Sequence, residues 1–370
     1  MLNAQVEGAV AGDYIVVMED AIPSATVDSV AAQATADGGT VTQRYGSAVT
    51  GFAATLPVEA LAAVRSASGV AYVEPDTVAT TVATAGADGT DDVQPGPPWG
   101  LDRIDQRKIR YDDEYRWKRD GTGVNVYVIS TGIRFSHEEF EGRAITGPDF
   151  YQPDEDSSDC TGDGTSFASV IGGRTYGVAK GATLVALRVT NCDGEGTASD
   201  TLAAIDWVTA NAEDRGVISL NQQFSPSEAL NDAVAAAYAA GIPSTVPAGN
   251  FEQDSCVLSP QQEPTAITVA ATDFDDTEAF FSSHGECVDI YAPGVDITTA
   301  WTGSDTATAL YTATEPAAAH VAGALAKLIE KFPAATAEEL TDTLIDRSTK
   351  DKLTDLGPGS PNQLLFSRKH

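Results

Sequence analysis

The sequence predicts an α/β domain with a mostly parallel sheet flanked by helices, preceded by a small α+β domain of the ferredoxin-like type. Three observations support this prediction. After residue 99, apolar runs of strand length alternate with helical stretches. The first 76 residues follow the order strand, helix, strand, strand, helix, strand. Between them, residues 77–98 have almost no large apolar side chains, which indicates an exposed linker.

The first domain, residues 1–76, has recognisable starts and stops. Tyr14–Met18 is an apolar run with β-branched residues, as expected of a strand. Gly38 and Gly39 end a helix that is rich in Ala and Val. Pro57 opens a second helix, where its missing N–H removes no hydrogen bond. The expected strands are therefore 14–18, 40–45, 49–56 and 70–73, and the expected helices are 25–36 and the stretch from 57.

The second domain, residues 99–370, contains the strands of the predicted parallel sheet. Residues 124–129 are almost all apolar, as in a strand that is buried on both faces. Residues 184–187 and 217–220 show the same character. Helical stretches lie between and after these strands, and we expect helices at 199–212, at 228–240 and from about 317 to 332.

The charge balance is strongly acidic and restricts the partners. The chain has 54 Asp and Glu against 22 Lys and Arg, a formal net charge of -32. Such a surface repels nucleic acids and anionic membranes, because both are polyanions. No apolar stretch is long enough to span a bilayer. We therefore expect neither nucleic acid nor membrane as a partner, and we interpret the acidic residues as a solvated surface.

Four cysteines indicate the compartment. None forms a Cys-x-x-Cys pair and the chain has only four histidines, so a zinc site is not expected. Two structural disulfides in an oxidising compartment account better for an even number of cysteines, and four cysteines permit three pairings. Residues 1–5 lack the basic and apolar regions of a signal peptide. We expect a secreted protein whose signal peptide is not part of this sequence.

Several ordered segments resemble the subtilase family, in particular its proteinase K-like branch. Residues 123–133 resemble the strand that ends in Asp-Thr-Gly, and residues 159–165 resemble the Gly-His-Gly-Thr-His segment. Residues 248–250 match the oxyanion segment, and residues 320–323 follow the place of the nucleophile. The first domain resembles the inhibitory propeptide of this family. The resemblance implies a subtilisin-like fold with the protein's own propeptide domain as a partner.

The resemblance fails at the catalytic triad. Ser130, Asp163 and Glu315 stand where the family has its Asp, His and Ser. Serine protease chemistry needs a hydroxyl nucleophile, an imidazole base and a carboxylate that orients the imidazole. The oxyanion residue Asn250 is retained. The resemblance therefore implies a subtilisin-like protein that is not an active serine protease.

No other residues are expected to restore the triad. His137, His284 and His320 occupy positions where the family has ordinary structural residues, so we interpret them as structural or surface histidines. Ser166 follows Asp163 closely, but no strained turn holds it as a nucleophile.

The resemblance also implies where a peptide would bind. In the family, glycines in the second substrate segment let a peptide lie close, but here Asn221, Gln222 and Gln223 replace them. This change argues against unchanged peptide binding. The substrate-binding residues implied by the resemblance are Gly194, Gly196, Ser219, Leu220, Asn221 and Gln222.

The two acids suggest a different chemistry. Asp163 and Glu315 stand where an imidazole and a hydroxyl are hydrogen-bonded neighbours, so we expect their carboxyl groups to be in hydrogen-bonding reach. Two carboxylates this close do not both ionise readily, and one is expected to hold a proton with a raised pKa. Ser130 would hydrogen-bond Asp163, and Asn250 would stabilise developing negative charge. Such a pair is a candidate acid–base site.

Three function classes follow. The first is a pseudoprotease that binds a peptide or another small-molecule ligand in the old cleft without cutting it. The alternative is an enzyme that uses Asp163 and Glu315 for an isomerisation, cyclisation or hydrolysis. The third is an acidic structural protein without a ligand. The replacements also fit drift after loss of activity, whereas deliberate mutation is disfavoured because Ser166, Pro316 and residues 221–223 differ as well.

The resemblance implies two further features. Related secreted proteases carry disulfides at places that correspond to Cys160–Cys192 and Cys256–Cys287. They also carry calcium at a site that corresponds to Asp289 and the backbone carbonyls of Pro264 and Ala266, and hard oxygen ligands suit this ion. We expect a structural calcium ion, no organic cofactor, a monomer, and a propeptide that stays covalently attached.

Overall fold

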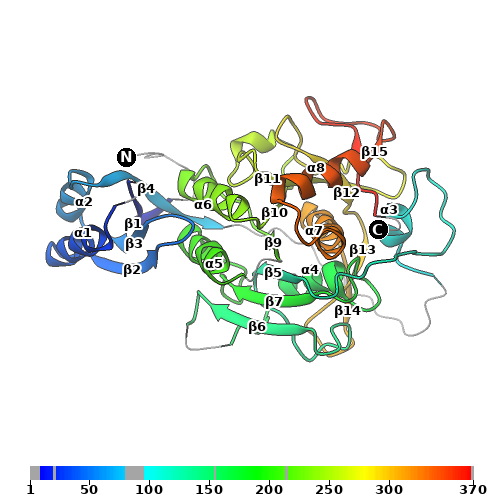
Figure 1. The fold of residues 1–370 in the computed structure, drawn as a ribbon, viewed down its shortest axis with the longest axis horizontal. Helices are drawn as coiled ribbons and strands as arrows, with labels where there is room; N and C mark the ends of the chain where they lie inside the picture. The colour runs from blue at the N-terminus through cyan, green and yellow to red at the C-terminus, as the bar shows by residue number, and fades with distance from the viewer. Residues whose placement is uncertain (1–8, 20–21, 80–95, 154–155, 213–215, 368–370) are drawn as a thin grey trace.

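The computed structural model consists of a small N-terminal domain attached to one side of a larger domain (Figure 1). It describes residues 9–19, 22–79, 96–153, 156–212 and 216–367. Most of the predicted linker, residues 80–95, lies outside the described residues. Within the described residues, no helix combines the length and the apolar character needed to cross a membrane.

The N-terminal domain is an antiparallel sheet with two helices on one face, as the sequence predicted. Alternate residues of its strands face opposite sides. Val16 and Phe52 pack against the two helices, whereas Ile15 and Ala53 pack against the large domain. The strands lie in the order β2-β3-β1-β4. Its elements are β1 (Ala9–Met18), α1 (Ser24–Ala36), β2 (Thr40–Tyr45), β3 (Gly51–Thr55), α2 (Val58–Arg65) and β4 (Val70–Ala79).

Strand β4 is longer than the sequence predicted and extends past the expected domain boundary at 76. It was expected to end near residue 73 because Glu74-Pro75-Asp76 is polar and contains a proline. Its far end instead pairs antiparallel with β8 (Gly196–Thr197) of the large domain, with Ala79 opposite Gly196. The sheet of the small domain therefore continues into the large one.

The large domain contains a nine-stranded sheet that is mostly parallel, which confirms the predicted fold class. Its order is β15-β16-β12-β11-β10-β9-β5-β7-β6. The central strands β5, β9 and β11 are almost completely buried, as their apolar sequences predicted. The strands are β5 (Asn125–Ser130), β6 (Ala144–Asp149), β7 (Thr183–Arg188), β9 (Gly216–Leu220), β10 (Ser244–Pro247), β11 (Ala266–Thr272), β12 (Ile290–Pro293), β15 (Thr349–Lys350) and β16 (Gln363–Leu364).

Helices cover both faces of this sheet. One core contains residues from α4, α7 and α8, and the other contains residues from α5 and α6 together with the N-terminal domain. A separate hairpin of β13 and β14 lies beside α4. These elements are α3 (Trp99–Ile104), α4 (Asp163–Gly172), α5 (Ala198–Asn211), α6 (Glu228–Ala239), β13 (Ile297–Ala300), β14 (Thr308–Tyr311), α7 (Thr314–Lys331) and α8 (Ala337–Arg347), with a short 3-10 turn at Ser255–Val257.

Two buried acids of β4 bind the N-termini of α5 and α6. Glu74 accepts hydrogen bonds from the Ser227 hydroxyl at 2.6 Å and from the Glu228 and Ala229 backbone N–H groups. Asp76 accepts from both the backbone N–H and the hydroxyl of Ser199. A negative charge at a helix N-terminus is favourable because the first N–H groups have no partner inside the helix. The first domain therefore packs against helices of the second, as expected for a propeptide domain that is the partner of its own chain.

Removal of the Glu74 carboxylate is expected to loosen the domain contact. In Glu74→Ala, three buried donors lose their acceptor, which costs about 2 kcal/mol. Hydrogen exchange at the Glu228 and Ala229 amides should become at least tenfold faster. Glu59→Ala, which removes an exposed carboxylate of α2, is the control. Unchanged protection of these two amides in Glu74→Ala would contradict this role.

Candidate functional site

The predicted site residues lie where strands of the parallel sheet end. Ser130 is the last residue of β5, Asp163 is the first residue of α4, and Glu315 is the second residue of α7. Asn250 follows β10. Loops at the carboxyl ends of parallel strands are the usual place of sites in α/β proteins. The Thr131 hydroxyl connects two of these segments, because it donates to Asp159 and accepts from the Gly164 N–H.

Helix α7 begins at Thr314, three residues earlier than expected. Pro316 suggested a start after this residue, but proline is compatible with the first helical turn, where its N–H would lack a partner. Glu315 thus belongs to the first turn of an 18-residue helix, where the helix dipole offsets part of the cost of its buried charge. The correction matters because the helix, and not a loop, orients the Glu315 side chain.

Glu315 is held by Asn250. The Asn250 Nδ2 donates to Oε1 and Oε2 of Glu315 at 3.1 and 2.9 Å. The Asn250 Oδ1 accepts from the backbone N–H and the hydroxyl of Thr314 at 2.8 and 2.9 Å. Glu315 is only 2% exposed. Both ends of the Asn250 amide therefore contact the start of α7, and its Nδ2 donates to a carboxylate.

Asp163 has a different partner. The Tyr311 hydroxyl donates to its Oδ1 at 3.0 Å, and Asp163 is 7% exposed. The expected hydrogen bond between Asp163 and Glu315 is absent, because each carboxylate binds its own neutral donor. The expected bond from Ser130 is also absent, since the buried Ser130 hydroxyl has no hydrogen-bond partner. The prediction that the two acids share a proton directly was wrong.

Burial dominates the protonation of both acids. It raises the pKa of Asp163 to about 6, against a lowering by the Tyr311 hydrogen bond. Burial also raises the pKa of Glu315 to about 7, and the bond from Asn250 lowers it. The charge of Asp163 raises the pKa of Glu315 further, but less than burial does. Both carboxyl groups thus change charge near neutral pH because they are desolvated, not because they share a proton.

Tyr311 was not predicted from the sequence. It ends β14, packs against Phe167 in an edge-to-face contact, and is fully buried. Burial and the neighbouring carboxylates raise its pKa well above the usual range of tyrosine, so it remains a hydrogen-bond donor. None of the quoted motifs contains this residue, and only the three-dimensional fold brings β14 to the start of α4.

The first predicted substrate segment already has a partner. Gly196 begins β8 and lies opposite Ala79 of β4 in the antiparallel pairing. A Cβ on Gly196 would come within 2.2 Å of the Val189 carbonyl, so a glycine is required there. Gly194 lies in the preceding turn with a φ of +79°, which also favours glycine. The chain's own strand thus occupies the edge at Gly196.

The second predicted substrate segment is buried. Ser219, Leu220, Asn221 and Gln222 have no exposed surface. Asn221 donates to the carbonyl and the hydroxyl of Ser219, and Gln222 accepts from the Thr201 hydroxyl. The side chains of this segment are therefore part of the interior rather than an open binding surface.

Gln223 closes the space beside Gly249. A Cβ on Gly249 would come within 2.7 Å of the Gln223 Oε1 and 2.9 Å of the Ser283 hydroxyl, so these side chains lie directly against the backbone before Asn250. Gln223 is 2% exposed, and neither end of its amide has a hydrogen-bond partner. The residue was noticed in the sequence as a departure from glycine, but its packing against Gly249 was not predicted.

Two of the predicted structural histidines are buried away from the acids. The His137 Nε2 lies 2.9 Å from the Ala307 carbonyl, and the His320 Nδ1 lies 2.8 Å from the Pro316 carbonyl. Burial lowers the pKa of His320 to about 4. Ser166 is also buried, and its hydroxyl has no partner. In the described part of the chain, no hydroxyl or thiol is hydrogen-bonded to a histidine.

Both predicted disulfides are confirmed. Cys160–Cys192 connects the loop before Asp163 to the loop that contains Gly194. Cys256–Cys287 connects the segment after Asn250 to the segment before Asp289. The bonds therefore fix four loops next to the candidate site residues.

The predicted calcium ligands lie near the start of β11. The Asp289 Oδ2 accepts from the Thr268 backbone N–H at 2.8 Å, and its Oδ1 accepts no hydrogen bond from the described residues. Pro264 is in the turn that leads into this strand, and Ala266 is its first residue. Within the described residues, no group of three or more His, Cys, Asp or Glu side chains forms a metal cluster. A carboxylate oxygen that accepts no hydrogen bond is the kind of hard ligand that calcium prefers.

Comparisons with known proteins identify the family. Residues 121–364 match the Subtilase family, and residues 13–81 match Peptidase inhibitor I9. The extracellular serine proteinase of Thermus sp. (strain Rt41A) is 41% identical over 331 residues, which cover 90% of this chain and 78% of that protein. The cuticle-degrading serine protease of Arthrobotrys oligospora is 36% identical over 389 residues, which cover 99% of this chain and 92% of that protein.

A solved structure supports the same assignment. The crystal structure of a cold adapted subtilisin-like serine proteinase has a TM-score of 0.71 and 41% identity to this chain. It covers 74% of this chain, and 98% of its own length is matched. The chain belongs to the subtilase family and carries a peptidase inhibitor I9 domain before its subtilisin-like domain.

Proposed function

We propose that the protein is a non-proteolytic member of the subtilase family, a secreted pseudoprotease in which Ser130, Asp163 and Glu315 replace the catalytic triad. One observation carries this proposal: Glu315 is a buried carboxylate, and the Asn250 Nδ2 donates to it. A carboxylate in this place offers no hydroxyl nucleophile, and it occupies the amide that would otherwise stabilise an oxyanion.

The proposed role of the cleft is binding rather than cutting. Strand β4 pairs with the edge at Gly196, and Gln223 fills the space beside Gly249. A peptide from outside therefore has to displace the chain's own strand and finds little room beyond it. The ligand that best fits this cleft is the N-terminal domain of the same chain. We therefore propose a monomer whose cleft is occupied by its own N-terminal domain.

The acid–base enzyme remains the second candidate because both carboxyl groups have a raised pKa, about 6 for Asp163 and about 7 for Glu315. Catalysis also requires access to a substrate. The two acids are 7% and 2% exposed, and each is hydrogen-bonded to a separate side chain. The observations therefore favour structural acids over a proton-transfer pair.

The purified protein is expected to remain one chain of 38.5 kDa, because self-cleavage needs a nucleophile. Intact-mass measurements over several days check this. Glu315→Gln and Asp163→Asn should match wild type in showing no turnover of peptide substrates. Turnover by wild type that either substitution abolishes would support the enzyme candidate instead. Spontaneous, concentration-independent cleavage of the pure protein would contradict the pseudoprotease.

Rebuilding the triad alone is expected to fail. Because Gln223 lies against Gly249, a peptide side chain has no space even when the catalytic groups are present. We expect no hydrolysis of a chromogenic peptide by the variant Ser130→Asp, Asp163→His, Glu315→Ser. Addition of Asn221→Gly, Gln222→Gly and Gln223→Gly should produce hydrolysis at least tenfold above the detection limit. Equal activity of the two variants would show that the three polar side chains do not obstruct the cleft.

The pH dependence of stability should reveal the burial of Glu315. Its pKa is raised from 4.5 to about 7, so the folded state binds the proton more tightly than the unfolded state. The resulting stabilisation is complete below pH 4.5 and is lost as pH rises through 7. A shift of this size corresponds to about 3 kcal/mol.

Between pH 5 and 8, the free energy of unfolding should therefore fall less for Glu315→Gln than for wild type. This difference is expected whatever the absolute stability of the variant at pH 5. Urea denaturation at each pH gives the comparison. Glu59→Gln, which alters an exposed carboxylate, is expected to follow wild type. Parallel profiles for wild type and Glu315→Gln would contradict the burial of this charge.

We also propose a structural calcium ion at Asp289, with the carbonyls of Pro264 and Ala266. Removal of the ion by a chelator should lower the melting temperature, because an ion that binds only the folded state stabilises it. The same treatment should leave the melting temperature of Asp289→Asn almost unchanged. An unaltered melting temperature of wild type after exhaustive chelation would exclude a tightly held ion.

A further inference from the structure

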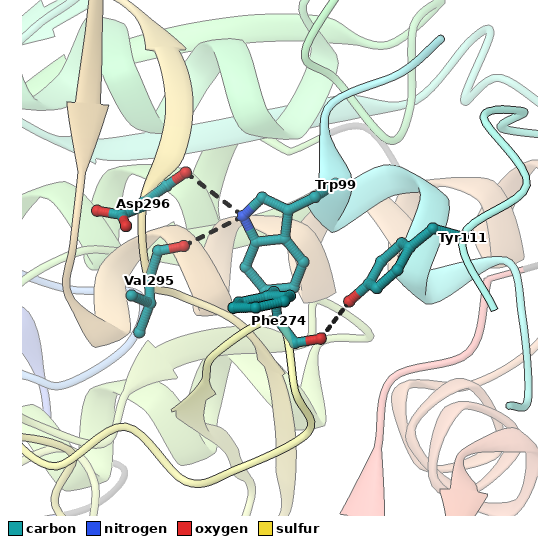
Figure 2. A pocket seen from close by; sticks show the side chains of 5 residues that line it. All are labelled: Trp99, Tyr111, Phe274, Val295 and Asp296. Carbon is teal, nitrogen blue, oxygen red and sulfur yellow. Dashed lines mark hydrogen bonds between the residues drawn. The ribbon is translucent and has the colours of Figure 1, made fainter. Parts of the chain in front are cut away.

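A pocket lined by aromatic side chains lies outside the candidate site. It has a volume of about 300 Å³ and is lined by Trp99, Tyr111, Phe274, Val295 and Asp296. Trp99 begins α3, Phe274 follows β11, and Val295 follows β12. Figure 2 shows the rings of Trp99, Phe274 and Tyr111 around this space. This volume is at the lower end of the range for small-molecule sites.

The polar groups of these rings are already used. The Trp99 Nε1 donates to the carbonyls of Val295 and Asp296 at 3.2 and 3.4 Å. The Tyr111 hydroxyl donates to the Phe274 carbonyl. A ligand therefore meets ring surfaces, and neither the indole nor the phenol has a donor to spare. An anion would find no hydrogen-bond donor among these rings, whereas aromatic faces carry partial negative charge.

The surroundings of the pocket are acidic. Asp296 lines it, although Figure 2 shows its carboxylate turned away from the indole. Asp273 and Asp275 are the chain neighbours of Phe274. Arg110 precedes Tyr111 and is exposed, whereas Arg103 is neutralised by Asp276, which accepts at 2.6 and 2.7 Å. Acids outnumber basic groups around the pocket.

Tyr111 is close to charges of both signs. Burial contributes most to its raised pKa, and the charge of Arg103, which lowers it, is the largest single charge effect. The charges of Asp276, Asp102 and Asp275 each raise it. The net charge of -32 adds a long-range attraction for cations.

We propose that this pocket binds a small quaternary ammonium cation. Trp, Tyr and Phe faces attract such cations by cation–π interaction, and a trimethylammonium group needs no hydrogen-bond acceptor. The two hydrogen bonds of Trp99 and the one of Tyr111 hold the rings in place before the ligand arrives, which reduces the entropy lost on binding. Binding at this pocket does not depend on whether the cleft beside Glu315 binds or cuts a peptide.

Choline is the probe, and 3,3-dimethylbutan-1-ol, which has the same shape without the charge, is the matched neutral control. Full-length protein is titrated at constant ionic strength, with NaCl replacing choline chloride. We expect an upfield NMR shift of the choline methyl protons, which lie over aromatic rings, and a shift of the Trp99 indole N–H. The neutral alcohol should bind at least fivefold more weakly. Equal binding of both probes would overturn the proposal.

Substitutions test whether choline binds in this pocket. Phe274 is 56% exposed, so Phe274→Ala is expected to fold and to weaken choline binding about fivefold or more. Phe280→Ala removes an aromatic side chain that is 86% exposed and lies outside the pocket, and binding should not change. Asp275→Asn should weaken binding about twofold. The proposal fails if choline leaves the Trp99 signal unshifted at saturating concentration, or if Phe280→Ala loses as much affinity as Phe274→Ala.

Discussion

The pairing of β4 with both domains is the contact on which the arrangement of this molecule depends. Along one strand, β4 completes the small sheet beside β1, carries Glu74 and Asp76 to the starts of α6 and α5, and ends against β8. Each buried acid exchanges its bonds to water for bonds from N–H and hydroxyl donors at the helix starts. Those donors would otherwise have no partner inside the helices. The same strand that joins the domains therefore also occupies the edge of the large domain at Gly196.

The sequence predicted the scaffold better than the side-chain contacts of the site. The strand expected at 124–129 lies at 125–130, because continuous apolar character depends only on burial. Glu315 was expected just before a helix that in fact begins at Thr314, and its partner was not predicted. Whether Glu315 contacts Asp163 or Asn250 depends on side-chain rotamers. It also depends on Tyr311 of β14, which is the partner of Asp163. The residues in these two contacts are separated by 65 and by 148 positions in the sequence, so no local sequence pattern predicts them.

Two acids can be buried in this site because their neutral forms are favoured and because each has a neutral hydrogen-bond donor. A buried carboxylate is costly when charged, and the raised pKa values of Asp163 and Glu315 show that the folded chain favours their neutral forms. Asn250 and Tyr311 supply neutral donors, which lower the penalty without introducing a second charge. In a chain with a net charge of -32, a neutral hydrogen-bonded cluster also avoids adding repulsion at the end of the sheet.

The fold and the chemistry of the site are separable for a physical reason. The sheet is stabilised by apolar strands and by α4 to α7, whereas Ser130, Asp163 and Glu315 lie at element ends. Asp163 and Glu315 are hydrogen-bonded there to Tyr311 and Asn250. Replacements there leave the core intact as long as each buried polar group finds a partner. Gln223 and Ser130 have no hydrogen-bond partner, so the cluster contains both stabilising bonds and uncompensated groups. A site built for proton transfer would require its buried polar groups to be paired and positioned, and these two are not. That mixture is why we favour the proposed pseudoprotease over the acid–base enzyme.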